Sequence, residues 1–113
     1  MNDKFLIIKY IKEFIISLDD LVINFPRKQF TIKDRMINDS LDILELVYIA
    51  NLNIENKKDI KIEILSKLSM LDFYLERSYK NKIISEKVCK KKCNELEKIS
   101  KLVYGWIKSD NKV

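Results

Sequence analysis

Apolar residues recur every three or four positions over long stretches of the chain, which is the spacing of an amphipathic helix. In the first such stretch, residues 3–24, a row of apolar residues at intervals of seven, Ile8, Ile15 and Val22, lies beside the main apolar row. A single neighbouring helix covers a narrower stripe, so we expect the first helix to have two flanking helices or to contact another subunit. That helix is predicted over residues 3–24, and its main row consists of Ile7, Ile11, Phe14, Leu18, Leu21 and Phe25.

The only proline of the chain, Pro26, ends this first helix. Proline cannot continue a helix from within, and it shifts the residue before it, Phe25, toward an extended backbone. The chain therefore turns here. We expect Phe25 and Phe30 to hold the turn against the core, while Arg27 and Lys28 stay in water at its tip.

Three further helices are predicted over residues 31–53, 57–80 and 85–108. Thr31 and Ser85 are the expected N-caps, because their hydroxyl groups can accept bonds from free backbone N–H groups. In the second helix the predicted core row is Ile37, Leu41, Leu44, Tyr48 and Leu52, with Met36, Ile43, Val47 and Ala50 alongside. Its end and the following connection are indicated by Asn51, Asn53 and Asn56.

The last two helices have equally regular rows. The third is predicted to bury Ile64, Leu68, Leu71 and Leu75, supported by Ile60, Leu65 and Phe73. The fourth carries Cys89, Leu96 and Val103, with Leu102 and Trp106 near its end. Four helices of about 20 residues with short connections predict one all-α domain, an antiparallel up-down-up-down four-helix bundle.

The residue types that most enzymes and metal sites need are scarce. The 113 residues include no histidine, so the commonest general base and metal ligand is missing. Gly105 is the only glycine, which excludes a glycine-rich phosphate loop. We therefore expect no catalytic residues, no cofactor and no metal. Cys89 and Cys93 lie one helical turn apart and are predicted to be packing residues; the alternative is half of a zinc site completed by a symmetry mate.

The net charge of +5 is unevenly distributed. Residues 1–76 carry 11 basic and 13 acidic side chains, whereas residues 77–108 carry 10 basic and three acidic ones. Such a basic segment is typical of proteins that bind polyanions, although a solvated helix face has the same composition. Lys90, Lys91 and Lys92 spread over more than half of the helix circumference, so at least one of them should face a neighbouring helix. Lys90 and Lys91 are candidates for phosphate contacts.

Only three of the 22 basic residues are arginines, namely Arg27, Arg35 and Arg77. A guanidinium group binds phosphate or carboxylate with two parallel bonds, so these three are also candidate binding residues. Arg27 and Arg35 could lie together at one end of the bundle. Pairing with Asp34 or Asp39 is the structural alternative.

Gly105 stands next to Trp106 near the end of a good helix, where glycine costs about 1 kcal/mol relative to alanine. The pair predicts a close helix contact, within the bundle or between subunits. Alternatively, Trp106 simply closes the core.

Neither a signal peptide nor an apolar run of the roughly 20 residues needed to cross a bilayer is visible in the sequence. We expect a soluble, cytoplasmic protein without a membrane partner.

Several segments, in order and with compatible spacing from Tyr10 to Lys108, together resemble one family. They are Phe25-Pro26-Arg27-Lys28, Leu44-Glu45-Leu46, Leu71-Asp72-Phe73-Tyr74-Leu75-Glu76, Ile84-Ser85 and the run from Ile99 to Lys108. The chain is similar in these segments to the Avd-like proteins (accessory variability determinants). These are encoded beside the reverse transcriptases of diversity-generating retroelements.

The resemblance implies a four-helix bundle that assembles into a barrel-shaped homopentamer. It further implies a non-catalytic accessory whose basic surface binds a reverse transcriptase and template RNA, with DNA as a further ligand, in support of mutagenic cDNA synthesis. By matching position, Arg27 and Lys28 are the basic pair after the proline, and Lys101 is the basic residue of the last helix. The Gly105-Trp106 pair matches the end of the family pattern. A self-assembling scaffold that does not bind nucleic acid is the alternative function.

The chain departs from this family at a few positions. Asp72 and Glu76 stand where arginines are common, and Ser100 and Tyr104 stand where glycines are frequent. The first change replaces two cations by two anions on one helix face, which bears on nucleic-acid binding more than on the fold.

Overall fold

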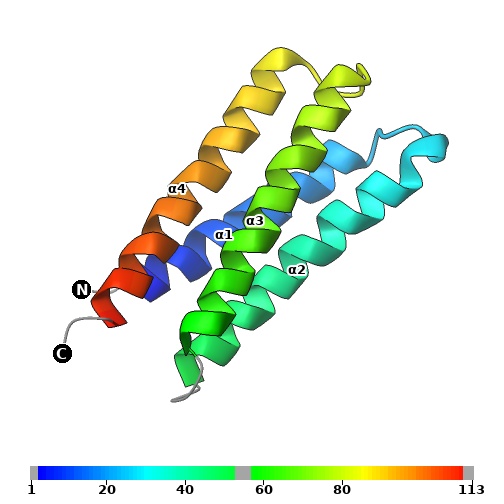
Figure 1. The fold of residues 1–113 in the computed structure, drawn as a ribbon. Coiled ribbons are helices and arrows are strands. Elements are labelled where there is room, and N and C mark those ends of the chain that lie inside the picture. The colour runs from blue at the N-terminus through cyan, green and yellow to red at the C-terminus, as the bar shows by residue number, and fades with distance from the viewer. Residues whose placement is uncertain (1–2, 53–56, 111–113) are drawn as a thin grey trace.

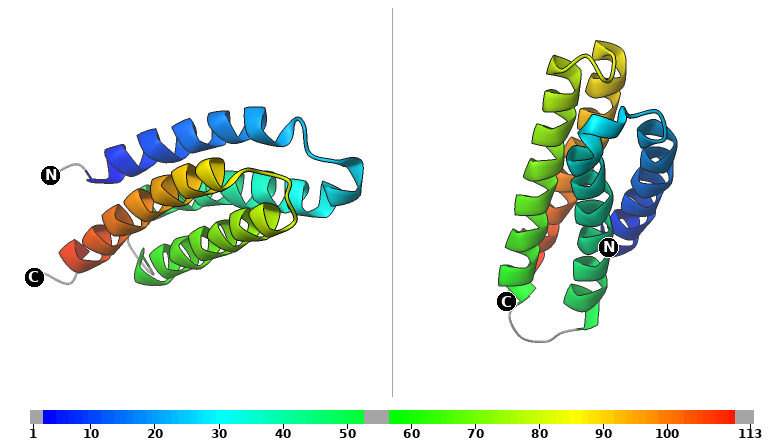
Figure 2. Two further views of the ribbon diagram at one scale, coloured as in Figure 1. Left: turned by 90° about the horizontal axis from the view of Figure 1, so that it is seen from above. Right: turned by 90° about the vertical axis from the view of Figure 1, so that its right-hand side faces the viewer.

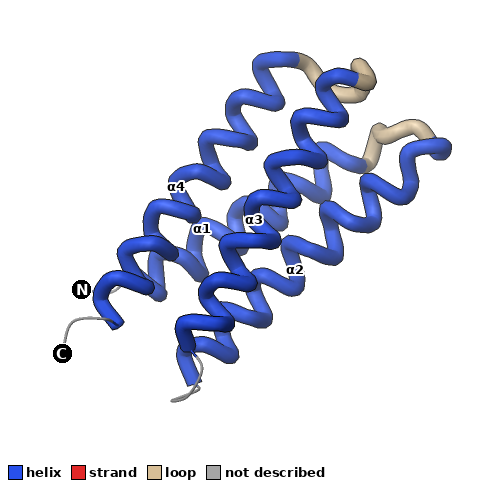
Figure 3. The backbone as a smooth tube through the Cα atoms, in the orientation of Figure 1, coloured by secondary structure: helices blue, strands red, loops and turns tan. Residues whose placement is uncertain are grey.

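The structure is a computed structural model that describes residues 3–52 and 57–110. Within these ranges the chain is helical apart from short connections, and no strand is present (Figures 1 and 3). Four helices pack against one another (Figure 1). The helices are α1 (Asp3–Val22), α2 (Phe30–Leu52), α3 (Lys57–Lys80) and α4 (Glu86–Asp110), and a short 3-10 helix, η1 (Arg27–Gln29), precedes α2.

Each helix packs against two others, so the four helices surround a common core. α1 and α3 each contact both α2 and α4. The wide apolar stripe of α1 is therefore flanked by two helices of the same chain. The bundle measures 49 × 22 × 19 Å. The α1–α2 and α3–α4 connections lie at one end, and the start of α1 and the end of α4 lie at the other (Figure 2).

The core contains most of the rows that the sequence predicts. In α1 the first four residues of the main row and Val22 are buried, whereas Leu21 and Phe25 are half-buried. In α3 and α4 the predicted rows are confirmed, except that Phe73 is exposed. Burying a large aliphatic or aromatic side chain contributes about 1.5–3 kcal/mol, so these rows supply most of the drive for helix packing. The confirmed buried residues are Ile7, Ile11, Phe14, Leu18, Ile64, Leu68, Leu71, Leu75, Cys89, Leu96, Val103 and Trp106.

The predicted core row of α2 is wrong. Leu41, Tyr48 and Leu52 are exposed, the last to 85%, and Ile37 and Leu44 are half-buried. The helix is rotated by about a third of a turn from the predicted orientation, so that the accompanying row faces the core. The residues buried in α2 are Ile32, Met36, Asp39, Ser40, Ile43, Val47 and Ala50.

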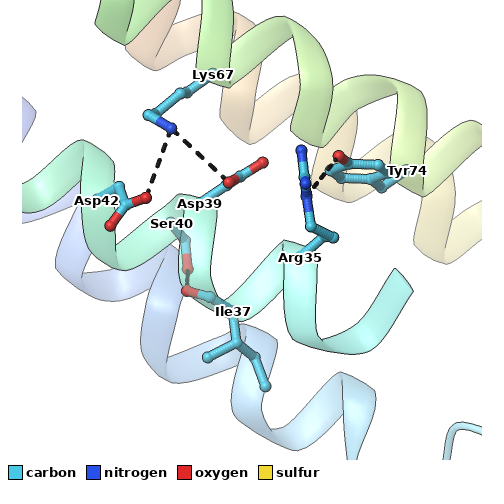
Figure 4. A network of polar contacts seen from close by, with 7 residues as sticks. All are labelled: Arg35, Ile37, Asp39, Ser40, Asp42, Lys67 and Tyr74. Carbon is cyan, nitrogen blue, oxygen red and sulfur yellow. Dashed lines mark hydrogen bonds and ion pairs between the residues drawn. The ribbon is translucent and has the colours of Figure 1, made fainter. Parts of the chain in front are cut away.

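Two polar residues occupy core positions of α2, which explains this error. The hydroxyl of Ser40 donates a hydrogen bond to the carbonyl oxygen of Ile37, 2.8 Å away, so its polar atom is satisfied within the helix (Figure 4). The carboxylate of Asp39 lies 3.9 Å from the ammonium group of Lys67. A buried polar group costs little when it is hydrogen-bonded or paired.

The turn after α1 differs in detail from the prediction. α1 ends at Val22, two residues early, and the N–H of Phe25 bonds to the Val22 carbonyl at 3.0 Å. Phe25 packs against the core, but Phe30 is 61% exposed. Arg27 is exposed, as expected at the tip of the turn.

The expected N-cap of α2 is also wrong. Thr31 lies inside the helix, because η1 runs directly into α2 at Phe30. The predicted end at Asn53 and the signal from Asn56 lie outside the described residues.

The α3–α4 connection is made without glycine. The N–H of Lys82 bonds to the carbonyl of Tyr79 at 2.9 Å, and the N–H of Ile83 bonds to the carbonyl of Ser78 at 2.8 Å. These two bonds form a Schellman motif, in which the residue at the Lys82 position has a left-handed backbone. Lys82 has φ of 61°. Ser85 then caps α4 as predicted, since its Oγ accepts a bond from the N–H of Val88 at 3.1 Å.

Among the residues whose burial the structure describes, two lysines are buried in the bundle. Lys61 is fully buried, with its Nζ 4.1 Å from the ring centroid of Trp106. Lys92 is 6% exposed and contacts Ser17 and Glu95. The expectation that one of the three consecutive lysines faces a neighbouring helix is therefore confirmed. Trp106 is buried beside the half-buried Gly105, as expected if it closes the core.

None of the described helices combines the length and the apolar character that crossing a membrane requires.

Candidate anion-binding site

A hollow of about 530 Å³ opens between the start of α2 and the end of α3. Pro26 and η1 carry the chain across the end of the bundle, which places Lys28 and Gln29 at one rim. Arg77 comes from the last turn of α3. The seven lining residues are Lys28, Gln29, Thr31, Ile32, Arg35, Tyr74 and Arg77.

A hydrogen bond between α2 and α3 fixes one guanidinium group in this hollow. The Nε of Arg35 donates to the hydroxyl of Tyr74 at 3.1 Å, and the guanidinium carbon lies 6.0 Å from the centroid of the same ring (Figure 4). Tyr74 is only 8% exposed, so it is a rigid support. A guanidinium group has five N–H donors, and this contact uses one of them. Among the described residues its remaining donors have no hydrogen-bond partner, so they can bind an anion.

The cations of the hollow are not neutralised by carboxylates. No acidic residue lines it, and Lys28, Arg35 and Arg77 form no ion pair within residues 3–52 and 57–110. The expected alternative, Arg35 paired with Asp34 or Asp39, does not occur there. Instead, the ammonium group of Lys67 forms an ion pair with Asp39 and lies 3.5 Å from the carboxylate of Asp42 (Figure 4). Three positive charges around one concavity favour an anion.

A second hollow, of about 260 Å³ between α1 and α4, has mixed charge. Glu13 and Glu95 line it together with Lys98. The hollow between α2 and α3 is therefore the better anion site.

The outer side of α4 is a second basic feature, which we call the α4 lysine face. At about 100° per residue, its members fall within roughly a third of the helix circumference. All are exposed. Two of them form ion pairs along the helix, Lys90 with Glu86 at 3.7 Å and Lys101 with Glu97 at 3.3 Å. The face consists of Lys87, Lys90, Lys91, Lys98, Lys101 and Lys108.

Six of the seven candidate binding residues that the sequence predicts thus fall into two groups, and Arg27 belongs to neither. The structure brings Lys28, Arg35 and Arg77 together in the hollow, whereas Lys90, Lys91 and Lys101 belong to the α4 lysine face. Arg27 is exposed in η1 and does not line the hollow.

Asp72 and Glu76 do not line the hollow. Asp72 lines one hollow between α3 and α4 together with Cys93, and Glu76 lines another together with Cys89. Replacing cations by anions at these positions therefore leaves the charge of the hollow unchanged.

Three polar residues of the hollow, Gln29, Thr31 and Tyr74, were not predicted as site residues. A signal for Tyr74 exists, because Arg35 and Tyr74 are equally far along the chain from the α2–α3 connection. Helices joined by a short connection bring such positions together. Nothing in the sequence indicates that Gln29 and Thr31 face the hollow, since this depends on the path of η1.

The two cysteines are packed as thiols. Their sulfur atoms are 4.0 Å apart, and the Sγ of Cys89 lies 3.7 Å from the carbonyl oxygen of Leu75. Burial, and then the carboxylate of Asp72, raises the pKa of Cys93, so the thiolate that metals bind is disfavoured. The described part of the chain holds no group of three or more cysteines and carboxylates that could bind a metal ion.

These observations leave the hollow and the α4 lysine face as the two candidate sites. Comparisons of the chain with protein-family models, with curated proteins and with solved structures find no match.

Proposed function

We propose that this protein is a non-catalytic accessory of a reverse transcriptase, which binds the template RNA through its basic surfaces. The observation that carries the proposal is the gathering of three cations without carboxylate partners, Lys28, Arg35 and Arg77, in one hollow. The resemblance to Avd-like proteins supplies the partner enzyme and the role in mutagenic cDNA synthesis.

The two basic features have different tasks in this proposal. The α4 lysine face attracts phosphates without reading sequence, since each lysine that neutralises a phosphate releases a counter-ion. Because phosphates are common to both nucleic acids, the α4 lysine face would bind DNA as well as RNA. The hollow fixes the position of the nucleic acid, because Tyr74 holds the guanidinium group of Arg35 in one orientation.

A third surface supports self-assembly, and we call it the α1–α2 apolar face. Its members on each helix share one side, and the two rows meet where the Nζ of Lys12 lies 6.0 Å from the ring centroid of Tyr48. We propose that copies of the antiparallel bundle associate through it, as a pentamer if the family resemblance holds. The face consists of Phe5, Ile16 and Ile23 from α1 and Leu41, Tyr48 and Leu52 from α2.

The same face favours a second candidate function. Exposed apolar side chains that share one side of α1 and one side of α2 are the kind of patch that marks a protein interface. A self-assembling structural scaffold without nucleic-acid binding would need this face and neither basic feature.

RNA retention at two salt concentrations separates the two functions. For single strands the logarithm of the binding constant falls with the logarithm of salt concentration, by about 0.7 for each neutralised phosphate. The proposed function requires binding at low salt that weakens at moderate salt. Retention that is absent at low salt, or that does not change with salt, leaves the scaffold function.

Charge reversal tests the residues. Replacing Arg27, Lys28 and Lys101 together by glutamate should weaken RNA binding without changing subunit number. The matched control replaces Lys4, Lys9 and Lys58, which are equally exposed but lie outside both basic features. Equal loss in both triple variants would show that only net charge matters, and normal binding in the first would remove these assignments.

A further inference from the structure

We infer that the hollow between α2 and α3 receives a terminal phosphate group, the phosphomonoester at the end of an oligonucleotide or of a free mononucleotide. This inference deepens the proposed function and rests on it for the oligonucleotide.

The charge of the hollow fits a phosphomonoester better than an internal phosphodiester. A phosphodiester carries one negative charge, whereas a phosphomonoester at pH 7 carries about 1.5 to 2 and offers three strong acceptor oxygens. Lys28, Arg35 and Arg77 provide three positive charges, and no carboxylate in the lining offsets them. The additional charge of a chain end therefore matches the three cations of the hollow more closely than one phosphodiester does.

The shape of the hollow points the same way. An internal phosphate enters with a strand on both sides, which suits an open surface such as the α4 lysine face. A terminal group can enter a concavity end-on. The volume of about 530 Å³ lies within the range of small-ligand pockets, about 300 to 1,000 Å³, so a phosphate can enter with its sugar.

The residues that line the hollow are suited to bind a phosphate group and not to stack on a base. Proteins that bind single strands commonly stack bases on open aromatic rings. Tyr74 is the only aromatic residue of the lining, and it is nearly buried with the Arg35 guanidinium over its ring. Its hydroxyl accepts the bond from Arg35 and keeps its own proton to donate to a phosphate oxygen.

The test compares short RNA strands of one sequence that carry a 5′-phosphate, a 3′-phosphate or only hydroxyl ends, by fluorescence anisotropy with the full chain. One phosphorylated form should bind about tenfold more tightly than the hydroxyl form, because charge-assisted bonds are strong. A nucleoside monophosphate should compete for the hollow, and the nucleoside should not.

Two variants locate the effect. Arg77→Gln should remove the preference for the phosphorylated end. Because Arg77 is exposed, this replacement should not unfold the protein, so unfolding would not explain the loss. The matched control, Lys101→Gln on the α4 lysine face, should weaken all strands equally. A preference that survives both Arg77→Gln and Lys28→Gln overturns the assignment to the hollow.

Failure of this inference is distinguishable from failure of the proposed function. Salt-dependent RNA binding with equal affinity for all three ends supports the proposed function and overturns the terminal-phosphate site. Binding of the nucleoside monophosphate that is lost in Arg77→Gln, without retention of RNA, supports the site and overturns the proposed function.

Discussion

The ammonium group of Lys92 on α4 donates a hydrogen bond to the hydroxyl of Ser17 on α1. It also lies 3.3 Å from the carboxylate of Glu95 and 5.6 Å from the ring centroid of Phe14. A charge at this depth is tolerated because it is paired, and removal of one partner leaves it poorly compensated. This contact fixes α4 against α1 at one position along the bundle.

Ser17→Ala should lower the free energy of unfolding by about 1–3 kcal/mol, because a buried charged donor loses an acceptor. Urea denaturation measures the change. In a Lys92→Met background the same replacement should cost less than about 0.5 kcal/mol, since no charge is left to satisfy. Equal costs in the two backgrounds would show that Ser17 stabilises the bundle independently of Lys92.

Lys82→Gly should raise the free energy of unfolding by about 0.5–1 kcal/mol. The left-handed backbone at φ of 61° costs a lysine more than a glycine, although glycine gains entropy in the unfolded chain. Lys80→Gly is the matched control in the last turn of α3, where glycine should destabilise by about 1 kcal/mol. If both glycines destabilise, the left-handed residue carries no strain.

The raised pKa of Cys93 predicts a loss of stability at alkaline pH. The unfolded thiol releases its proton above its usual pKa of 9.0, whereas burial and Asp72 keep the folded thiol protonated. The unfolded state then binds fewer protons, so the free energy of unfolding falls as the pH rises above 9.0 and is unaffected below it. Urea midpoints over this range should fall less steeply for Cys93→Ala. An unchanged slope in that variant would assign the decline to other groups.

The orientation of α2 predicts different costs for two neighbouring aliphatic residues. Ile43→Ala should lower the free energy of unfolding by about 2–5 kcal/mol, because Ile43 is fully buried. Leu41→Ala, on the exposed side, should change it by less than about 1 kcal/mol. Chemical denaturation of the two variants at one protein concentration compares them directly. A larger loss of stability for Leu41→Ala than for Ile43→Ala would show that the row predicted from the sequence is the buried one.

Introducing charge on the α1–α2 apolar face should dissociate the assembly. Ile16→Lys combined with Leu52→Lys places two cations on a surface that association would bury, while each remains solvated in the single chain. Light scattering should report a smaller mass with an unchanged helical circular dichroism spectrum. The control Ile62→Lys, on an exposed part of α3, should leave the mass unchanged. A chain that is monomeric before any replacement removes the assembly proposal.

Much of the helical content could be predicted because it depends on local sequence. Pro26 stops α1, Ser85 caps α4, and the apolar spacing of α1, α3 and α4 identifies their buried sides. The face of α2 could not be predicted in the same way. A rule that follows uninterrupted apolar residues fails where Asp39 and Ser40 are buried with their polar atoms satisfied.

The candidate site could be predicted only in part, for a related reason. Arginines in a lysine-rich chain attract notice in the sequence, and two of them, Arg35 and Arg77, line the hollow. Their approach depends on how α2 and α3 align, and this is a property of the packed bundle. The hydrogen bond by which the buried Tyr74 holds the guanidinium group of Arg35 depends on the same alignment of α2 and α3.

The positions of the chain ends have a practical consequence for experiments on the hollow. The bundle is 49 Å long, and the connection between α1 and α2, which contains η1, lies at the end opposite to the start of α1 and the end of α4 (Figure 2). A fluorophore attached at the start of α1 or at the end of α4 is therefore far from the mouth of the hollow. A signal that such a distant label gives upon ligand addition reports a response of the whole bundle and not contact with the ligand.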